Sequence, residues 1–353
     1  SPDLPPHPAV IKVLQEESAK PGNHAYQSYK GSPVLRNAIA EWYKQWYQVS
    51  LNANTEILPL IGSKEGIMHI CMTYLNEGDF ALIPDPGYPT YGAAVKLAGA
   101  QPVNYDLAAG QYWTPDLDVL ESEVKELNGR GAGSVKLMFV NYPHMPTGQL
   151  PDRELLTKLV RFAKANELLL IHDNPYSFIL NENPASILAI EGAREVAMEL
   201  NSLSKSHNMA GWRVGMLLAS ADRINEVLKF KSNMDSGMFL PVQLAAAAAL
   251  RLDKAWYLSV NETYRKRQTK VFALLDLLKC HYNPQQAGMF VWAAIPEGVT
   301  DGYALSDELL YKADVFITPG GIFGKNGNGY VRISLCCPEE KIEQAINRIK
   351  DKI

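Results

Sequence analysis

Residues 196–215 read Val-Ala-Met-Glu-Leu-Asn-Ser-Leu-Ser-Lys-Ser-His-Asn-Met-Ala-Gly-Trp-Arg-Val-Gly. The largely apolar run Val196–Leu200 predicts a buried strand, and a polar segment containing Lys205 and Arg213 follows it directly. An earlier segment has the same arrangement, since the apolar run Leu168–Ile171 leads into His172-Asp-Asn-Pro-Tyr176. Two buried strands that each end in chemically active side chains indicate a sheet with a ligand-binding edge.

The same pattern extends in both directions along the chain. Further short apolar runs are Ile57–Ile61, Phe80–Ile83, Leu137–Val140 and Met216–Ala219, and helical patterns separate most of them. Continuous apolar strands that alternate with helices are typical of a largely parallel sheet covered on both faces. We therefore expect the polar residues at the carboxyl ends of these strands to lie close together.

The two ends of the chain differ from this middle part. The segment Ser32–Tyr47 predicts a helix, with Ser32 as its N-cap and Pro33 at the first helical position. After about residue 222 the pattern turns helical, and Ala255–Cys280 predicts one long connecting helix. The tail combines expected strands at 289–294, 315–318 and 330–335 with helices at 304–312 and from Pro338 onward. It therefore predicts a smaller α+β lobe.

Composition limits the class of protein. The 353 residues include 34 Lys and Arg against 38 Asp and Glu, so the formal net charge is −4. This weakly acidic balance gives no electrostatic case for nucleic acid or an anionic membrane as a partner. The four scattered cysteines form no C-x-x-C pair, so we expect neither a metal site nor a disulfide framework. With no apolar run long enough to cross a bilayer, the expected location is the cytoplasm.

Lys205 is the first candidate for chemistry. A lysine at the rim of a buried site loses solvation, which lowers its pKa and makes its amine a nucleophile toward aldehydes. Ser202 and Ser204 precede it, and Arg213 follows eight residues later, a set of hydroxyls and a guanidinium that suits a phosphate. A phosphate-bearing aldehyde held by a lysine as a Schiff base is pyridoxal phosphate. Taken alone, this motif is also compatible with a surface lysine near a structural arginine.

Asp173 strengthens the case for a bound cofactor. It ends an apolar strand, where an isolated carboxylate is costly unless a cation pairs with it. A protonated pyridine nitrogen is such a cation, and the carboxylate would keep that nitrogen charged. Tyr176 and Asn141 are candidates to contact the phenolic oxygen of the same ring. Each residue also has a structural reading, since Asp173 suits a helix N-cap and Tyr176 suits simple packing.

Three further elements fit the same ligand. The loop Gly62-Ser-Lys-Glu-Gly66 lies between a strand and a helix, where backbone N–H groups can bind phosphate oxygens, although such turns are often glycine-rich. Tyr88 follows a strand in a proline-rich turn and suits stacking on a flat ring. Arg332 lies between apolar neighbours in an expected strand. It has two interpretations: an arginine that points outward from an edge strand, or a guanidinium that binds a substrate carboxylate through two hydrogen bonds.

With these residues in place, the chain resembles the pyridoxal-phosphate-dependent aminotransferases of classes I and II, which share the aspartate aminotransferase fold. The resemblance covers essentially the whole chain. The matching segments are Tyr26–Gly31, Pro33–Ala40, Gly62–Gly66, Tyr88, Asn141–Gly148, Asp173 with Tyr176, Ser202–Gly215, Gly288–Trp292 and Arg332. One departure lies at His144 and Met145, where this family usually has two asparagines.

The resemblance implies an α/β fold of type I. A large domain, residues 22–255, would hold a mostly parallel seven-stranded sheet sandwiched by helices. Residues 1–21 and 256–353 would form the smaller α+β domain. Such enzymes are homodimers with shared active sites.

The resemblance also implies a role for each candidate residue. Lys205 would form the Schiff base and shuttle a proton, Asp173 would pair with the ring nitrogen, and Tyr88 would stack on the ring. The remaining roles are as follows: Asn141 and Tyr176 at the phenolic oxygen; Ser63, Lys64, Ser202, Ser204 and Arg213 at the phosphate; Tyr26 at the phosphate of the partner subunit; Arg332, with Asn141, at the substrate carboxylate.

The implied reaction moves an amino group from an L-amino acid to a 2-oxo acid. The main alternative keeps the cofactor but is a β-eliminating C–S lyase, because both reactions begin with loss of the α-proton. A cofactor-holding regulator would carry a DNA-binding module, and a nucleotide-dependent oxidoreductase would carry G-x-G-x-x-G; the sequence contains neither.

The choice of substrate is less constrained. The segment Asn233–Phe239 is similar to that of aminotransferases acting on LL-diaminopimelate, aspartate and related broad-range substrates. The sequence offers no second arginine dedicated to a side-chain carboxylate. His172 and His207 have no chemical partner in the sequence and are expected to be structural.

Overall fold

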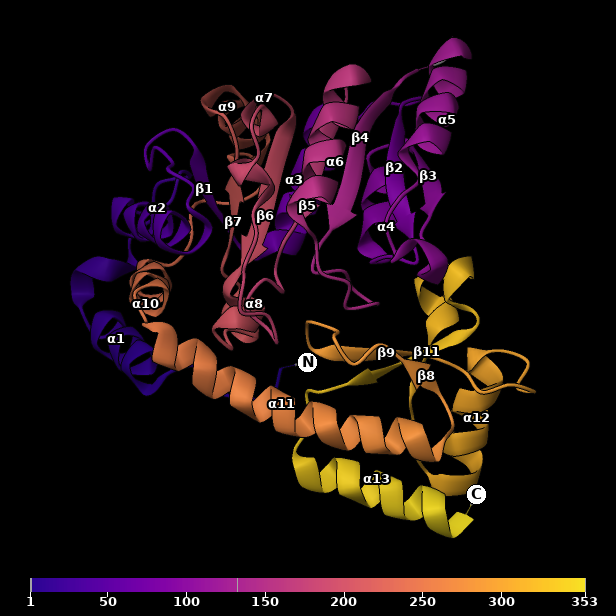
Figure 1. Ribbon diagram of the computed structural model, residues 1–353. Coiled ribbons are helices and arrows are strands. Elements are labelled where there is room, and N and C mark those ends of the chain that lie inside the picture. The colour runs from indigo at the N-terminus through magenta and orange to yellow at the C-terminus, as the bar shows by residue number, and fades with distance from the viewer. Residues whose placement is uncertain (1, 132, 353) are drawn as a thin grey trace.

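A computed structural model describes residues 2–131 and 133–352 of the chain. It contains two sheets, each with its own helices (Figure 1). The strands of the larger sheet are β1 (Ile57–Leu60), β2 (Phe80–Asp85), β3 (Gln101–Asp106), β4 (Val135–Asn141), β5 (Leu169–Asp173), β6 (Ala197–Ser202) and β7 (Gly215–Leu218). Their order across the sheet is β1-β7-β6-β5-β4-β2-β3, and β7 alone runs antiparallel to its two neighbours. The expected seven-stranded, mostly parallel sheet is confirmed.

Helices cover both faces of this sheet, as expected for strands without a polar face. One face packs against α2 (Pro33–Tyr47), α5 (Leu117–Gly129), α6 (Arg153–Ala165) and α10 (Leu240–Leu250). The other packs against α3 (Ser63–Tyr74), α4 (Thr90–Leu97) and α9 (Ala221–Lys231). Strand β4 illustrates why both faces need cover, because its side chains alternate between two hydrophobic cores. Met138 and Val140 enter the core on the first face, and Leu137 and Phe139 enter the core on the second face.

The second sheet lies in the smaller lobe. Its strands are β8 (His281–Tyr282), β9 (Phe290–Ala294), β10 (Thr318–Pro319) and β11 (Tyr330–Ser334), in the antiparallel order β10-β11-β9-β8. The long helix α11 (Lys254–Leu277) leads into this lobe from α10, and α12 (Gly302–Ala313) and α13 (Glu339–Lys352) complete it (Figure 1). The helices and the sheet of this lobe share one hydrophobic core, which includes Val271 of α11, Leu309 of α12 and Val331 of β11.

Shorter elements connect these units. They are α1 (Pro8–Ser18), α7 (Ala193–Val196), α8 (Leu203–Ser206) and the 3₁₀ turns η1 (Pro21–His24), η2 (Ala109–Gln111), η3 (Ile187–Ala189), η4 (Ala210–Trp212), η5 (Gly320–Phe323) and η6 (Lys325–Gly327). The N-terminal segment touches both lobes, because Val10 enters the large core while Leu4 packs on the small one. The domain boundaries at residues 21 and 255 therefore stay a prediction.

Local signals placed most elements correctly. Helix α2 begins as expected, since Ser32 Oγ accepts a hydrogen bond from the Val34 N–H at 3.1 Å. Three strands differ from the expectation. The two-residue strand β8 follows the expected helix Ala255–Cys280 and was not expected. Strand β3 was missed because Gln101–Asp106 is a mostly exposed edge strand with no apolar run. The strand expected at 315–318 is wrong in extent, because only Thr318 and Pro319 pair with β11.

Within the two described ranges, no helix is both long and apolar enough to cross a membrane.

Candidate active site

The carboxyl edge of the large sheet gathers the predicted polar side chains. Asn141 ends β4, Asp173 ends β5 and Ser202 ends β6, and the first two are paired across the sheet. These parallel strands end at the same edge, so residues 32 and 29 positions apart in sequence become neighbours (141 to 173 and 173 to 202). The chain then turns directly into α8, which carries Lys205.

A cavity of about 540 Å³ opens at this edge, between the two lobes. Its lining includes the predicted residues Ser63, Lys64, Tyr88, Asn141, Asp173, Tyr176, Ser202, Ser204, Lys205, Arg213 and Arg332. Of the described residues expected at the site, Tyr26 alone lies outside this lining, and its side chain is 90% exposed.

Asp173 lacks a partner on one carboxylate oxygen. Tyr91 donates its hydroxyl hydrogen to Oδ2 at 2.8 Å, whereas Oδ1 has no hydrogen-bond partner among the described residues. The side chain is only 5% exposed, and burial raises the pKa of Asp173 to about 6. Such a carboxylate is stabilised by a buried cation with an N–H group. A protonated pyridine ring fits this requirement.

Another part of the cavity lining is suited to an anion. Helix α3 starts here, and among the described residues no side chain caps its first N–H groups. Gly62 has φ +82°, and a Cβ on it would lie 2.2 Å from Nη2 of Arg213. A Cβ on Gly215 would lie 2.5 Å from the backbone nitrogen of Ser63. The two glycines therefore let a guanidinium and a helix N-terminus approach the same space, which suits a phosphate.

Ser202 and Ser204 extend this anion site. Ser202 Oγ caps α8 by accepting a hydrogen bond from the Ser204 N–H at 3.1 Å, and the two hydroxyls lie 2.8 Å apart. Both line the cavity, so the short helix α8 fixes the hydroxyls and Lys205 relative to one another.

Lys205 lines the same cavity as Asp173 and Arg213. Burial lowers its pKa, and the positive charges of Arg213 and Arg332 act in the same direction, although Cys336 and Asp173 oppose them. Its Nζ lies 5.9 Å from the centre of the Tyr176 ring. A lysine in this setting is more readily deprotonated, as a nucleophile or base requires.

Arg332 closes the cavity from the small lobe. Its guanidinium carbon lies 3.9 Å from the ring centre of Phe290 and 4.4 Å from that of Phe323. Nη1 lies 3.3 Å from the Met145 sulfur, a weak acceptor, and Nε has no partner within residues 2–131 and 133–352. Burial lowers the pKa of Arg332 to about 10. This guanidinium is positioned for a carboxylate that arrives with a ligand.

Tyr88 and Asn141 have more mixed environments. Tyr88 packs edge-on against Tyr91, with 5.6 Å between the ring centres. The Nζ of Lys64 lies 5.6 Å from the centre of the Tyr88 ring. Asn141 Nδ2 donates to the carbonyl oxygen of Asp173 at 2.7 Å, and Oδ1 accepts from the Met145 N–H at 2.8 Å. The amide of Asn141 therefore ties the ends of two strands to the following loop.

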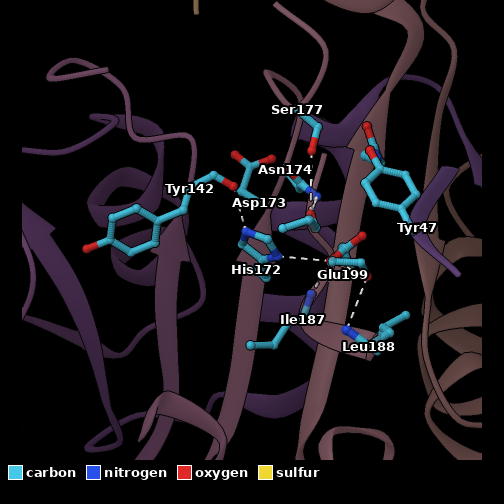
Figure 2. Close-up of polar contacts among 12 residues, drawn as sticks. Tyr47, Tyr142, His172, Asp173, Asn174, Ser177, Ile187, Leu188 and Glu199 are labelled. Atoms are coloured by element: carbon cyan, nitrogen blue, oxygen red, sulfur yellow. Dashed lines mark hydrogen bonds and ion pairs between the residues drawn. The ribbon is translucent and has the colours of Figure 1, made fainter. Parts of the chain in front are cut away.

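A buried hydrogen-bond network around His172 and Glu199 lies next to Asp173 (Figure 2). His172 Nδ1 lies 2.9 Å from Oε2 of Glu199, and His172 Nε2 lies 2.8 Å from the carbonyl oxygen of Tyr142. Both ring nitrogens therefore face oxygen atoms, one from a carboxylate and one from a backbone carbonyl group. The remaining hydrogen bonds to Glu199 come from Tyr43, Ser186 and the backbone N–H of Ile187. The expected structural role of His172 fits this position next to Asp173.

Sequence reasoning missed several residues of the cavity. Tyr91, Met145, Phe290, Phe323 and Cys336 line it alongside the predicted set. Tyr91 carried one usable signal, since it stands three residues after Tyr88, and the turn that joins them, closed by a hydrogen bond from the Tyr91 N–H to the Tyr88 carbonyl oxygen at 3.1 Å, keeps the two residues close together. The small-lobe residues carried none, because only the tertiary fold brings them to the sheet edge.

Comparisons with known proteins agree with this geometry. The family model "Aminotransferase class I and II" matches residues 1–349. An LL-diaminopimelate aminotransferase of Dehalococcoides mccartyi is 38% identical over 350 residues, which cover 99% of this chain and 88% of the relative. A second, from Moorella thermoacetica, is 39% identical over 351 residues with the same coverage of both chains.

Solved structures give the same picture. Substrate-bound BacF from Bacillus subtilis superposes with a TM-score of 0.93 at 36% identity, covering 99% of this chain and 88% of that chain. A probable N-succinyldiaminopimelate aminotransferase from Thermus thermophilus superposes with a TM-score of 0.90 at 32% identity, covering 100% and 93%.

Proposed function

The chain belongs to the class I and II aminotransferases, and we propose that the residues lining the cavity carry out amino-group transfer in the roles given below. The enzyme uses pyridoxal phosphate to move an amino group from an amino acid to a 2-oxo acid. The cofactor supplies an electron sink for the negative charge that develops at the substrate α-carbon. The assignment of individual residues is our proposal.

One observation carries these roles. Asp173 is buried, has a raised pKa, and offers a carboxylate oxygen that finds no partner in the described part of the chain. A free carboxylate there costs stability, so the site needs a cation of matching shape. Asp173 would keep the cofactor's ring nitrogen protonated, which strengthens the electron sink.

The anion site at the start of α3 would hold the phosphate. Arg213 would contribute a guanidinium with two N–H groups, and Ser202 and Ser204 would contribute hydroxyls. Ser63 and Lys64 would contribute backbone N–H groups from the first turn of the helix. Tyr88 would stack on the ring, while Tyr176 and the second hydrogen of Asn141 Nδ2 would contact the phenolic oxygen.

Lys205 would hold the cofactor through its amine and act as the base. Its lowered pKa favours the neutral amine, which Nζ needs in order to accept the proton from the substrate α-carbon. Arg332 would bind the α-carboxylate, so the α-hydrogen is presented toward Lys205. Phe290 and Phe323 would exclude water from the guanidinium, which strengthens this contact.

The amino donor is the finer part of the proposal. Because curated relatives include LL-diaminopimelate aminotransferases, we include LL-diaminopimelate with aspartate in a broad donor range. Arg332 recognises a group common to all α-amino acids. It therefore supports broad use of donors rather than strict selection of one.

We further propose a homodimer that works in the cytoplasm. Tyr26 is 90% exposed in the single chain, as expected for a residue that completes the phosphate site of a second copy. The cysteines Cys71, Cys280, Cys336 and Cys337 are all free, which fits a reducing compartment.

A spectroscopic titration tests the proposed function. The visible absorption of the cofactor-loaded protein is recorded before and after adding LL-diaminopimelate, aspartate, glutamate, phenylalanine and methionine, without an acceptor. We expect the visible band to disappear with the true donors and to return on adding a 2-oxo acid. Cystathionine, an S-substituted cysteine with a leaving group on its β-carbon, is tested in the same way, and release of pyruvate, ammonia and the thiol from it without an acceptor would instead identify a β-eliminating lyase. A band that no amino acid changes would refute amino-group transfer by this site.

A further inference from the structure

The two lobes are joined at a point outside the cavity, where Asp85 at the end of β2 meets the turn between η5 and η6. Asp85 is 1% exposed and does not belong to the cavity lining. The strand comes from the large sheet, whereas the turn belongs to the small lobe next to β11. Asp85 is therefore a buried carboxylate at a contact between the lobes.

The carboxylate of Asp85 binds backbone N–H groups of the turn. Oδ1 accepts from the Asn326 N–H at 3.0 Å, and Oδ2 accepts from the Lys325 N–H at 3.2 Å. The backbone of the same strand end adds two bonds, because the Asp85 carbonyl oxygen accepts from Asn326 Nδ2 at 3.1 Å and the Gly87 N–H donates to the Phe323 carbonyl oxygen at 2.8 Å. Hydrogen bonds to an ionised group are about twice as strong as neutral ones.

The turn is shaped for this carboxylate. Gly324 has φ +138°, and a Cβ at this position would lie 2.1 Å from Oδ1 of Asp85. A side chain is therefore excluded both by backbone conformation and by the closeness of the carboxylate. The approach of the turn to β2 depends on glycine here.

The same turn carries side chains into the cavity. Ile322 and Phe323 line it, and the ring of Phe323 stacks on the guanidinium of Arg332 at 4.4 Å. On the other side of Asp85, Tyr88 lines the cavity three residues later along the chain. The hydrogen bonds at Asp85 therefore connect the segment that carries Tyr88 with the turn that places Phe323 beside Arg332.

We propose that Asp85 is a positioning residue, which fixes the turn at 323–326 against the large lobe and thereby places Phe323 on Arg332 for binding of the substrate carboxylate. This inference rests on the proposed role of Arg332. It assigns to the end of β2 the function of holding the small lobe in its substrate-binding position.

The exposed charges nearby contribute little by comparison. Lys325 Nζ lies 3.5 Å from Asp106 Oδ1, but both side chains are more than 60% exposed. Exposed pairs of this kind are worth little because water and salt screen them. Asp106 ends the adjacent strand β3 and accepts a hydrogen bond from the same Asn326 side chain, so it is a matched control for Asp85.

The test measures binding of a probe that cannot react. The amino acid 2-aminoisobutyrate has an α-carboxylate and an amino group but no α-hydrogen, so its Kd follows from the change in the visible spectrum of the holoenzyme. Asp85→Asn keeps one acceptor oxygen and turns an NH₂ group toward the second backbone N–H. We expect its Kd to rise at least tenfold, while the visible band of the bound cofactor stays unchanged.

A second variant changes the other partner. Gly324→Ala leaves the carboxylate intact and forces the turn away from it, so its Kd should rise at least tenfold as well. Asp106→Asn should stay within twofold of the wild type. In steady-state assays with a true donor, Asp85→Asn and Gly324→Ala should raise KM at least tenfold and change kcat less than threefold.

The outcomes separate this inference from the proposed function. Should Asp85→Asn fold poorly, Gly324→Ala decides the matter alone. A Kd within twofold of the wild type in the well-folded variant overturns the positioning role. A fall in kcat with unchanged KM also overturns it. A wild type that binds the probe but transfers no amino group refutes the proposed function and leaves the binding comparison valid.

Discussion

Glu199 gives the sharpest test of how the site is supported. Its side chain is fully buried and accepts hydrogen bonds from Tyr43 at 2.6 Å and from His172, Ser186 and Ile187 at 2.9 Å each. The change Glu199→Gln keeps the size of the side chain and removes its charge. One oxygen becomes an NH₂ group, and the His172 ring loses its carboxylate partner.

The expected loss of stability follows from these contacts. Removing one member of a buried ion pair costs about 3–5 kcal/mol, because the other charge stays buried. Here the remaining amide oxygen still accepts neutral hydrogen bonds of about 1 kcal/mol each. We therefore expect Glu199→Gln to lower the unfolding free energy by about 3 kcal/mol, near the lower end of that range.

The assay is urea unfolding of the cofactor-free protein, followed by near-ultraviolet circular dichroism. Glu195→Gln is the matched control, because Glu195 pairs with Lys164 at a surface where both side chains are about 60% exposed. The control should lose less than about 1 kcal/mol. The double variant with His172→Gln should lose less than the sum of the two single changes, since the pair is in direct contact. Equal losses for Glu199→Gln and Glu195→Gln, or strict additivity with His172→Gln, would refute this reasoning.

Three further predictions concern the site itself. Lys205→Ala should abolish transamination while the circular dichroism spectrum is unchanged, and turnover near the wild-type rate would exclude Lys205 as the base. Burial raises the pKa of Asp173 to about 6, so the folded chain binds this proton more tightly than the unfolded chain. Between about pH 4 and 6 this one carboxyl group should therefore contribute a loss of up to about 3 kcal/mol of unfolding free energy to the cofactor-free protein as the pH rises. Urea unfolding of the wild type and of Asp173→Asn at several pH values should differ by that contribution, and an identical pH dependence of the two proteins would contradict it. Arg332→Gln should raise KM for every donor by about 100-fold, as loss of charge-assisted bonds predicts, whereas Met145→Leu, which removes only the sulfur contact, should leave KM within about threefold in the same steady-state assay.

The sequence predicted the large sheet because its central strands are apolar on both faces. The expected strand Leu137–Val140 lies wholly within β4, and Leu168–Ile171 lies within β5 except for Leu168. All residues of both runs are buried, as expected for strands covered on both faces. The edge strand β3 carries no such signal, since half its residues face solvent. Its pairing with β2 is decided by tertiary contact rather than by its own sequence.

The candidate site was predictable for a similar reason. Parallel strands bring their carboxyl ends together, so polar residues after several buried strands must share an edge. Phe290 and Phe323 could not be placed this way, because they come from the small lobe and reach Arg332 through long-range packing. The partner of Asp85 was equally hidden, since backbone N–H groups of a distant turn leave no mark in residue types.

The replacement of the usual asparagines at positions 144 and 145 has a structural explanation. Asn141 fixes the loop from its start, because its amide binds the Asp173 carbonyl oxygen and the Met145 N–H. His144 is buried and neutral, since burial lowers its pKa to about 3, and its Nδ1 lies 2.8 Å from the Thr147 hydroxyl.

The backbone of this loop therefore does not depend on the side chain at position 145. What changes there is the chemistry presented to Arg332, which meets a thioether at 3.3 Å instead of an amide. A thioether accepts hydrogen bonds weakly and donates none. It competes little with a carboxylate for the guanidinium, but it also gives a carboxylate no hydrogen bond. Under the role we propose for Arg332, recognition of the substrate at this wall of the cavity would therefore fall to Arg332 and to the residues that hold it in place.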